Sequence, residues 1–351
     1  MIRTILRYKR GLLLALAAAA LPCGAAAQSK VGTTAAQFLG IPVGARAIAM
    51  GGAYVAASQD GSSIYWNPGA VVQSSSSEFS FVNTDWLVGT KFRWFGLVLN
   101  LDGDNAIGAS VTDMDYGQGD VTTVASPEGT GETWSAADLA VSLSYSRRLT
   151  DKFSIGGTVK YINQRVYNET ASTVAFDAGL LYVTDLNGLR IGMSMSNFGG
   201  DMTLSGRDLL NRVDTDPNNA GSNKTLVAYL KTDAWPLPLL FRVGASMDVV
   251  KNDDIIATVA VDALRPNDDF ESINMGAEVG WWNTLFIRGG YQSIFKGGQA
   301  PLSNDKGQEG LTLGAGLRYH FEGFAALSFN YAFQKFGVFG NLNTIALSIG
   351  F

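Results

Sequence analysis

The sequence predicts an all-β fold, a 14-stranded antiparallel transmembrane β-barrel that follows an N-terminal helical or irregular segment. Only 16% of the 351 residues are charged and 41 are glycine, whereas soluble domains carry about 25% charged residues. No apolar run after Gln28 is long enough for a transmembrane helix, so a membrane would have to be crossed by a closed barrel. Along most of the chain, apolar residues alternate with small or polar ones, which is the period of a β-strand.

The alternation separates two faces of the predicted sheet. Residues 342–351, LNTIALSIGF, set Ile345, Leu347 and Ile349 against small or polar neighbours. The large apolar phase fits lipid, and the phase rich in Gly, Ser, Ala and Thr fits a lumen. A soluble β-sandwich, the alternative, would turn its polar face to water. The charged residues expected to line the lumen are Arg242, Asp248, Glu278, Arg288 and Arg318, together with Arg190 and Asp262.

The barrel is expected over residues 74–351. Alternating segments give fourteen strands, and bacterial barrels have an even number. The predicted strands are 76–84, 91–99, 105–115, 136–148, 152–164, 172–184, 189–198, 238–249, 255–264, 272–281, 284–292, 310–320, 324–333 and 342–351.

The connections between these strands alternate in length. Tight turns such as LDGD, LTDK and KNDD fall at every second gap, and the intervening gaps include much longer segments. Short turns are typical of the periplasmic end of a barrel and long loops of the outer end. Residues 115–135, 199–237 and 293–309 are therefore predicted outside the cell, and both barrel termini in the periplasm.

The N-terminus has the layout of a cleaved secretory signal over residues 1–27. A basic stretch that ends at Arg10 precedes an apolar run and three alanines before Gln28. Cys23 is the only cysteine, and Pro22 before it argues against a lipid anchor. Cleavage would leave no thiol, which excludes disulfides and cysteine–metal sites. It would also leave an acidic protein, for which nucleic acid is not an expected partner.

Residues 28–73 precede the barrel and do not alternate. They are predicted to form short helical pieces at 33–39, 45–50 and 62–66, joined by turns. Their many Gly and Ala residues would allow close approach to a lumen wall. A flexible leader is the alternative.

Aromatic residues gather near the predicted strand ends, where barrels carry girdles at the two membrane interfaces. They are Trp86, Trp94, Tyr161, Tyr182, Trp281, Trp282 and Tyr319. Phe351 ends the last strand and matches the terminal aromatic signal that the barrel-assembly machinery reads, although it is also simply the last lipid-facing residue.

No catalytic constellation is visible, so we do not expect an enzyme or a cofactor. A hydrolase would need a base near a nucleophile, and the only histidine, His320, falls in the lumen phase at the end of a strand. Asp113, Asp115 and Asp120 in DMDYGQGD resemble a calcium loop, but the spacing and the distal Glu of an EF-hand are missing. An acidic outer loop without a metal is the simpler interpretation.

The segment from Phe38 to Ala70, FLGIPVGARAIAMGGAYVAASQDGSSIYWNPGA, carries several short motifs in register. They are Phe38-Leu39, Gly44-Ala45-Arg46-Ala47, Met50-Gly51-Gly52-Ala53, Asp60 with Ser62-Ser63, and Tyr65-Trp66-Asn67-Pro68. This segment resembles the N-terminal signature of the PorV/PorQ family of outer-membrane barrels, which are related to FadL-type transporters. Relatives usually have Ala then Gly where this chain has Gly69-Ala70, and the exchange predicts shifted backbone angles, because Gly tolerates positive φ.

The resemblance implies a hatch that lies inside the barrel. Its expected residues are Gly44, Arg46, Met50, Gly51, Gly52, Asp60, Tyr65, Trp66, Asn67 and Pro68. Arg46 and Asp60 are candidates for ion pairs with Glu278 or Arg288, and Asn67-Pro68 for the turn that leads into the first strand.

The resemblance also implies a non-enzymatic role in type IX secretion. Such a barrel, inserted among outer-membrane lipids, would bind the translocon or the C-terminal domains of secreted cargo through its outer loops. A FadL-like channel, gated by the hatch and taking up hydrophobic small molecules, is the alternative. The charged residues on the inward face of the strands argue slightly against a channel with an apolar lumen.

Overall fold

The computed structural model of the chain describes residues 31–74, 76–186, 188–216, 218–219, 225–296, 310–321 and 326–351. The predicted signal peptide and most of the predicted loop 293–309 lie outside the described residues. Among those residues, no helix combines the length and the apolar character needed to cross a membrane.

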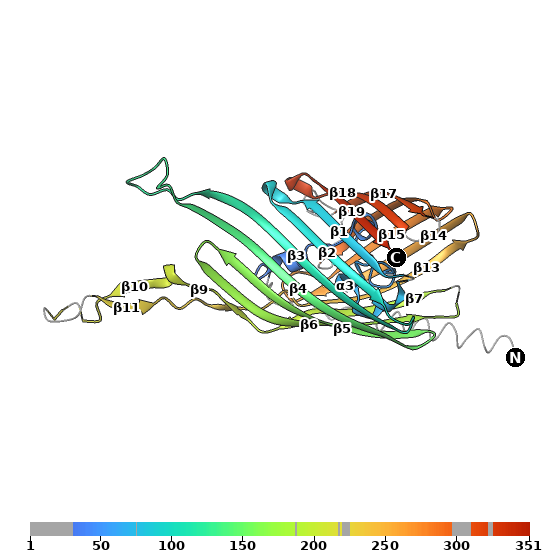
Figure 1. Cartoon of the computed structure of the whole chain (residues 1–351), viewed down its shortest axis with the longest axis horizontal. Coiled ribbons are helices and arrows are strands. Elements are labelled where there is room, and N and C mark those ends of the chain that lie inside the picture. Colours follow the sequence, from blue (N-terminus) through green and yellow to red (C-terminus); the bar gives the residue numbers. More distant parts are fainter. Residues whose placement is uncertain are drawn as a thin grey trace. The chain divides into compact units, whose positions relative to one another are not determined.

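Within the described residues, fourteen antiparallel strands close into a barrel, which confirms the predicted fold class (Figure 1). Strands next to each other in sequence pair throughout, except that β7 pairs with β13, and the first strand pairs with the last from Glu78↔Gly350 to Asp85↔Asn343. The barrel strands are β1 Glu78–Asp85, β2 Lys91–Asn100, β3 Asn105–Asp120, β4 Thr133–Thr150, β5 Phe153–Val166, β6 Glu169–Val183, β7 Arg190–Gly199, β13 Leu240–Lys251, β14 Ile255–Pro266, β15 Ser272–Trp281, β16 Leu285–Lys296, β17 Leu311–His320, β18 Ala326–Lys335 and β19 Asn341–Gly350.

The two faces of the strands separate as the alternation predicts. On β4, Leu143 and Tyr145 are exposed on the outer surface, whereas Ser142, Ser144 and Ser146 are buried toward the lumen. The outer surface thus forms the apolar band that contacts lipid. Trp94, which we expected in the aromatic girdle, is instead buried in the lumen at 1% exposure, because it lies in the inward phase of β2.

The strands β3 to β6 are longer than predicted. β3 continues to Asp120, and β4 begins at Thr133. Only Tyr167 and Asn168 separate β5 from β6. Alternating hydrophobicity marks only the part of a strand that faces lipid. It therefore does not reveal the part of a strand that continues beyond the membrane.

The connection between β7 and β13 contains structure that the alternation did not predict. It holds β8 Met202–Thr203, β9 Ser205–Gly206, η4 Arg207–Leu209, β10 Leu210–Val213, β11 Leu226–Tyr229 and β12 Ala234–Trp235. β10 and β11 pair only with each other and project beyond the neighbouring barrel strands (Figure 1). We call these two strands the arm.

The two ends of the barrel differ. The turn end carries the short connections 101–104, 151–152 and 252–254 and the end of β19. The loop end carries the connections 121–132 and 200–239.

The hatch lies inside the barrel and consists of four short helices joined by turns. They are η1 Gln37–Gly40, α2 Ala45–Ala49, α3 Ser63–Trp66 and η2 Pro68–Gln73. α2 packs against β16 to β19, and η2 against β3 to β6. Asn67-Pro68 therefore does not lead directly into the first strand, as we expected. It starts η2, because Asn67 Oδ1 accepts the N–H of Gly69 and proline suits the first helical turn.

Candidate functional site

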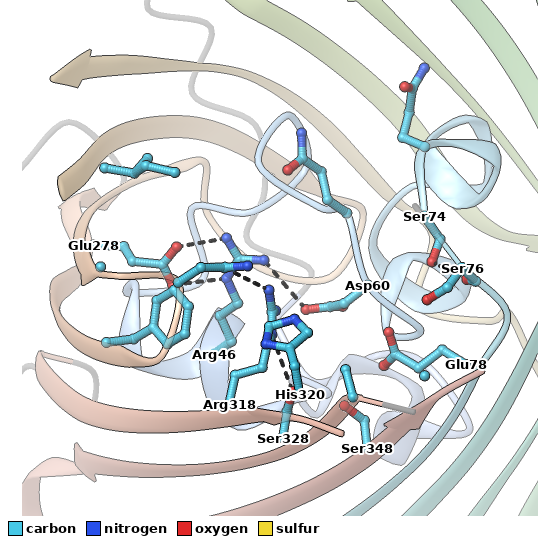
Figure 2. Close-up of a pocket in the computed structure, with 18 of the residues that line it drawn as sticks. Arg46, Asp60, Ser74, Ser76, Glu78, Glu278, Arg318, His320, Ser328 and Ser348 are labelled. Atoms are coloured by element: carbon cyan, nitrogen blue, oxygen red, sulfur yellow. Dashed lines mark hydrogen bonds and ion pairs between the residues drawn. The ribbon is translucent and has the colours of Figure 1, made fainter. Parts of the chain in front are cut away.

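The hatch contacts the lumen wall through a network of buried charges. Arg46, on α2, donates to Glu278 through Nε over 2.9 Å and through Nη2 over 2.7 Å. Glu278, on β15, also accepts a hydrogen bond from Nε of Arg288, its partner on β16. Asp60 Oδ2 lies 3.7 Å from Arg46 Nη1, and Figure 2 shows the two side chains facing each other. Two guanidinium groups thus face two carboxylates, which satisfies the need of buried charges for partners.

Asp60 also orders the hatch itself. Its Oδ1 accepts hydrogen bonds from the backbone N–H of Ser62 over 3.0 Å and from the Ser62 hydroxyl over 2.5 Å. The hydroxyl of Tyr54 donates to Oδ2 over 2.6 Å. Burial raises the pKa of Tyr54 well above its usual range, so the phenol keeps the proton that it donates.

Met50 and Gly51 lie against the backbone of the wall, and Gly52 lies against the side chain of Asn274. Gly51 and Gly52 have φ values of +67° and +70°, which side chains other than glycine rarely adopt. A Cβ on Gly51 would lie 2.6 Å from the carbonyl oxygen of Met275, and one on Gly276 would lie 2.2 Å from that of Met50. Hatch and wall therefore meet backbone to backbone here.

Asn67, Pro68 and Gly69 make a second contact of this kind. A Cβ on Gly179 would lie 2.2 Å from Asn67 Oδ1, and one on Gly156 would lie 2.2 Å from the carbonyl oxygen of Pro68. A Cβ on Gly69 would in turn lie 2.6 Å from the carbonyl oxygen of Gly179. Gly69 is not among the glycines with positive φ. Close approach to the wall accounts for glycine at this position, and a shift of the backbone angles relative to relatives stays a prediction.

Tyr65 and Trp66 join the hatch to a third part of the wall. Their ring centroids lie 5.1 Å apart, edge to face, and Trp66 Nε1 donates to the carbonyl oxygen of Val43 over 2.7 Å. Arg242 Cζ, from β13, lies 5.2 Å from the Tyr65 ring and 5.1 Å from the Trp66 ring. Gly44, with φ of +93°, precedes α2.

Two further predicted lumen charges, Asp248 and Arg318, bond to residues outside this network. Asp248 accepts a hydrogen bond from Nη2 of Arg190 over 2.7 Å. Nε of Arg318 donates to Ser328 Oγ over 3.3 Å (Figure 2).

Two cavities lie on opposite sides of the hatch. The turn-end cavity, of about 600 Å³, is lined by Arg46 and Asp60 of the hatch and by Glu78, Arg318 and His320 of the wall (Figure 2). The loop-end cavity, of about 670 Å³, has a mostly apolar lining that includes Phe38, Ile41, Trp66, Trp86, Met114 and Leu264. The hatch therefore separates a polar space from an apolar one.

The other sequence candidates have local partners. Asp113 and Asp115 each lie 3.6 Å from a guanidinium nitrogen of Arg93, which accounts for two of the carboxylates in the calcium-loop motif. In the part of the chain that the structure describes, no group of three or more His, Cys, Asp and Glu could hold a metal ion. Phe351 is exposed beside the turn-end cavity, and its part in barrel assembly stays a prediction.

A sequence model of the family described as type IX secretion system protein PorV matches residues 24–201. This chain belongs to the PorV family. No curated protein matches the PorV-family chain described here.

Solved structures share the fold of this PorV-family barrel. The CymD monoaromatic hydrocarbon channel is 15% identical with a TM-score of 0.53, over 88% of this chain and 96% of that one. The toluene transporter TbuX of Ralstonia pickettii is 13% identical with a TM-score of 0.50, over 88% and 97%. TodX of Pseudomonas putida, also a toluene transporter, is 15% identical with a TM-score of 0.50, over 88% and 96%. Identity this low shows the FadL-like fold alone.

Charged lumen residues of the PorV-family barrel were missed as site residues in the sequence, and one of them, Asp262, holds the hatch. Asp262 was placed in the lumen but not in the site, and its Oδ2 accepts the backbone N–H groups of Tyr54 and Val55 over 2.7 and 2.8 Å. Lys160 and Asp177 form a buried ion pair of 2.6 Å. Lys160 and Asp177 both lie in the inward phase of their strands, so the alternation could have identified them.

Proposed function

We propose that this PorV-family outer-membrane barrel is a non-enzymatic component of type IX secretion. It binds the translocon, the C-terminal domains of cargo, or both, through the arm in the long connection at its loop end, which faces the outside of the cell. The family match carries the proposal. Three features of the structure support it.

The first supporting feature is the arm. Its side chains include Leu226, Val227 and Tyr229, of which Val227 is 66% and Tyr229 is 64% exposed. An isolated two-stranded sheet offers unpaired edges to which another chain can add a strand. Exposed apolar groups of this kind mark interaction sites.

The second feature is the hatch. It touches the wall on two sides, through α2 at β16 to β19 and through η2 at β3 to β6. A folded partner would therefore be bound outside the barrel rather than passed through it.

The third feature is the neighbourhood of the arm, which contains further exposed apolar groups. Leu230 and Trp235 are 53% and 47% exposed and follow β11 along the connection. Together with the arm they extend the apolar surface at the loop end.

Replacement of residues 207–230 by a short Gly-Ser linker tests the proposal. We expect the barrel to fold and to reach the outer membrane, but gentle detergent extraction should no longer co-purify translocon or cargo chains, and cargo should no longer be secreted. Shortening of the β3–β4 connection at 121–132 is the matched control. Unchanged co-purification and secretion without the arm would contradict the proposal.

A FadL-like channel for hydrophobic small molecules is the second candidate, and the apolar loop-end cavity favours it. The solved structures of similar fold include toluene transporters. A gene deletion that abolishes uptake of a hydrophobic compound, while cargo is still secreted, would support the channel over the secretion role.

A further inference from the structure

The first leg of the arm, residues 200–209, is fixed to the barrel wall. β9 lies in this leg and pairs with the loop-end start of β6, where Glu169 lies opposite Gly206. Glu169 is buried, and its Oε1 accepts the backbone N–H of Asp208 over 2.8 Å. Nδ2 of Asn168 donates to Asp208 Oδ2 over 2.8 Å. The chain is therefore held in place up to the residues just before β10.

The second leg of the arm, residues 230–239, is bonded to the first. β12 pairs with β8, with Trp235 opposite Met202. Nearer to the arm, the hydroxyl of Thr232 donates to the carbonyl oxygen of Leu204 over 2.6 Å. Because the two legs are joined in this way, a contact that holds the second leg also holds the arm.

The hatch makes such a contact through its N-terminal segment, residues 31–37. The backbone N–H of Ala35 donates to the carbonyl oxygen of Pro236 over 2.9 Å. Leu237, the next residue of the second leg, is 3% exposed and belongs to the same buried cluster as Phe38 of the hatch. The hatch thus contacts the base of the arm as well as the lumen wall.

The N-terminal segment is itself held by Asp268, in the connection between β14 and β15. Oδ2 of Asp268 accepts hydrogen bonds from the hydroxyl of Thr34 over 2.7 Å and from Nε2 of Gln37 over 2.6 Å. Its backbone carbonyl oxygen accepts the N–H of Gly32 over 3.3 Å. Asp268 is 8% exposed. These bonds go to the N-terminal segment and not to either leg, so a change of the Asp268 side chain reaches the arm through that segment.

We propose that the hatch positions the arm for its partner, and that Asp268 is the positioning residue that holds the N-terminal segment against the second leg. The inference rests on the proposed function, because it takes the arm as the element that binds the partner. An element that is already ordered loses less conformational entropy on binding. Partner binding outside the barrel therefore depends on a hatch that is in place inside it.

Two substitutions of Asp268 test the proposal. Asp268→Ala leaves Thr34 and Gln37 without their acceptor and should loosen the N-terminal segment. We expect the translocon and cargo chains that co-purify in gentle detergent extraction, identified by mass spectrometry and counted per barrel, to fall at least about threefold. Asp268→Asn keeps a carbonyl oxygen that can accept both hydrogen bonds, so it should retain most of the partner. Asp253→Ala, in the exposed turn at the opposite end of the barrel, is the control.

Hydrogen exchange of the full chain without partner measures the anchoring directly. In Asp268→Ala, amides of residues 200–206 and 230–237 should exchange faster than in the wild type, whereas amides of the barrel strands should not change. Asp268→Asn and Asp253→Ala should exchange like the wild type. Heat-dependent mobility on gels shows that each variant is folded.

Three results would overturn the proposal. They are equal partner recovery by Asp268→Ala and Asp253→Ala, a loss of partner in Asp268→Asn as large as in Asp268→Ala, and unchanged exchange of the two legs in Asp268→Ala. The last result combined with lost partner would mean that the partner touches Asp268 itself. If replacement of residues 207–230 leaves recovery unchanged, the proposed function fails, whereas the exchange of the legs still decides whether the hatch anchors the arm.

Discussion

Glu278 accepts hydrogen bonds from two guanidinium groups, one on the hatch and one on the wall. Glu278→Gln removes the charge and leaves Arg46 and Arg288 facing each other. Loss of one partner of a buried ion pair costs about 3–5 kcal/mol, and we expect this loss to appear as loosening of the hatch rather than unfolding of the barrel. Faster hydrogen exchange of the amides in residues 44–66 is the measurement.

The control for that variant is Glu271→Gln. Glu271 lies 3.7 Å from Arg265, and both side chains are largely exposed. Exposed pairs contribute about 0–1 kcal/mol. Unchanged exchange in Glu278→Gln, or equal effects of the two variants, would show that the charge network does not hold the hatch.

Two adjacent glycines of β5 test the close contact between hatch and wall. A Cβ on Gly156 would lie 2.2 Å from the carbonyl oxygen of Pro68, whereas the nearest atom to a Cβ on Gly157 is 3.6 Å away. Gly156→Ala should therefore destabilise the hatch by about 1–3 kcal/mol through overpacking. Gly157→Ala should have little effect. Limited proteolysis of the hatch compares them, and equal cleavage would contradict the prediction.

Individual residues of the site could be predicted only in part. The inward phase of the strands identified Arg242 and Glu278 as lumen residues, and the motif placed Arg46 in the hatch. The pairing of Arg46 with Glu278 joins residues 232 positions apart, so the sequence could offer candidates but not choose among them. Trp94 was misplaced because aromatic residues suit both an interface and a packed lumen.

Among the elements, the fourteen barrel strands could be predicted because contact with lipid imposes alternation on each of them. The arm could not, because β10 and β11 have four residues each and lie outside the lipid band. η2 was missed for a related reason. The Asn67-Pro68 pair indicates both a turn and a helix start, and only the packing of η2 on β3 to β6 decides between them.

The arm can be tested as an element through its backbone pairing. Val227 pairs with Arg212, and Val227→Pro removes a donor and fixes φ, which disrupts a short strand pair. We expect partner co-purification to fall while the barrel stays folded. Val124→Pro, at an exposed position of the β3–β4 connection, is the control. If the Val227→Pro variant still co-purified its partners fully, the arm would not be the element that binds them.

At the scale of the molecule, the hatch separates two cavities of different character. The turn-end cavity contains the charges that hold the hatch in place, and the loop-end cavity contains the apolar walls and Arg242. A change in charge at the first cavity is therefore expected to act on hatch position, whereas a change in an apolar residue of the second leaves the charges that hold the hatch in place. The two effects should be separable by mutation.

The hatch also predicts that the barrel conducts poorly. A fourteen-stranded barrel is wide enough for a lumen, but α2 and η2 contact opposite groups of strands, β16 to β19 and β3 to β6. In planar bilayers, we expect the wild type to show little ion conductance and a variant without residues 31–66 to show stable open channels. Glu278→Gln should give intermittent openings, since it weakens the hatch without removing it, while Glu271→Gln should remain closed. Large, steady conductance of the wild type would mean that the hatch does not seal the lumen.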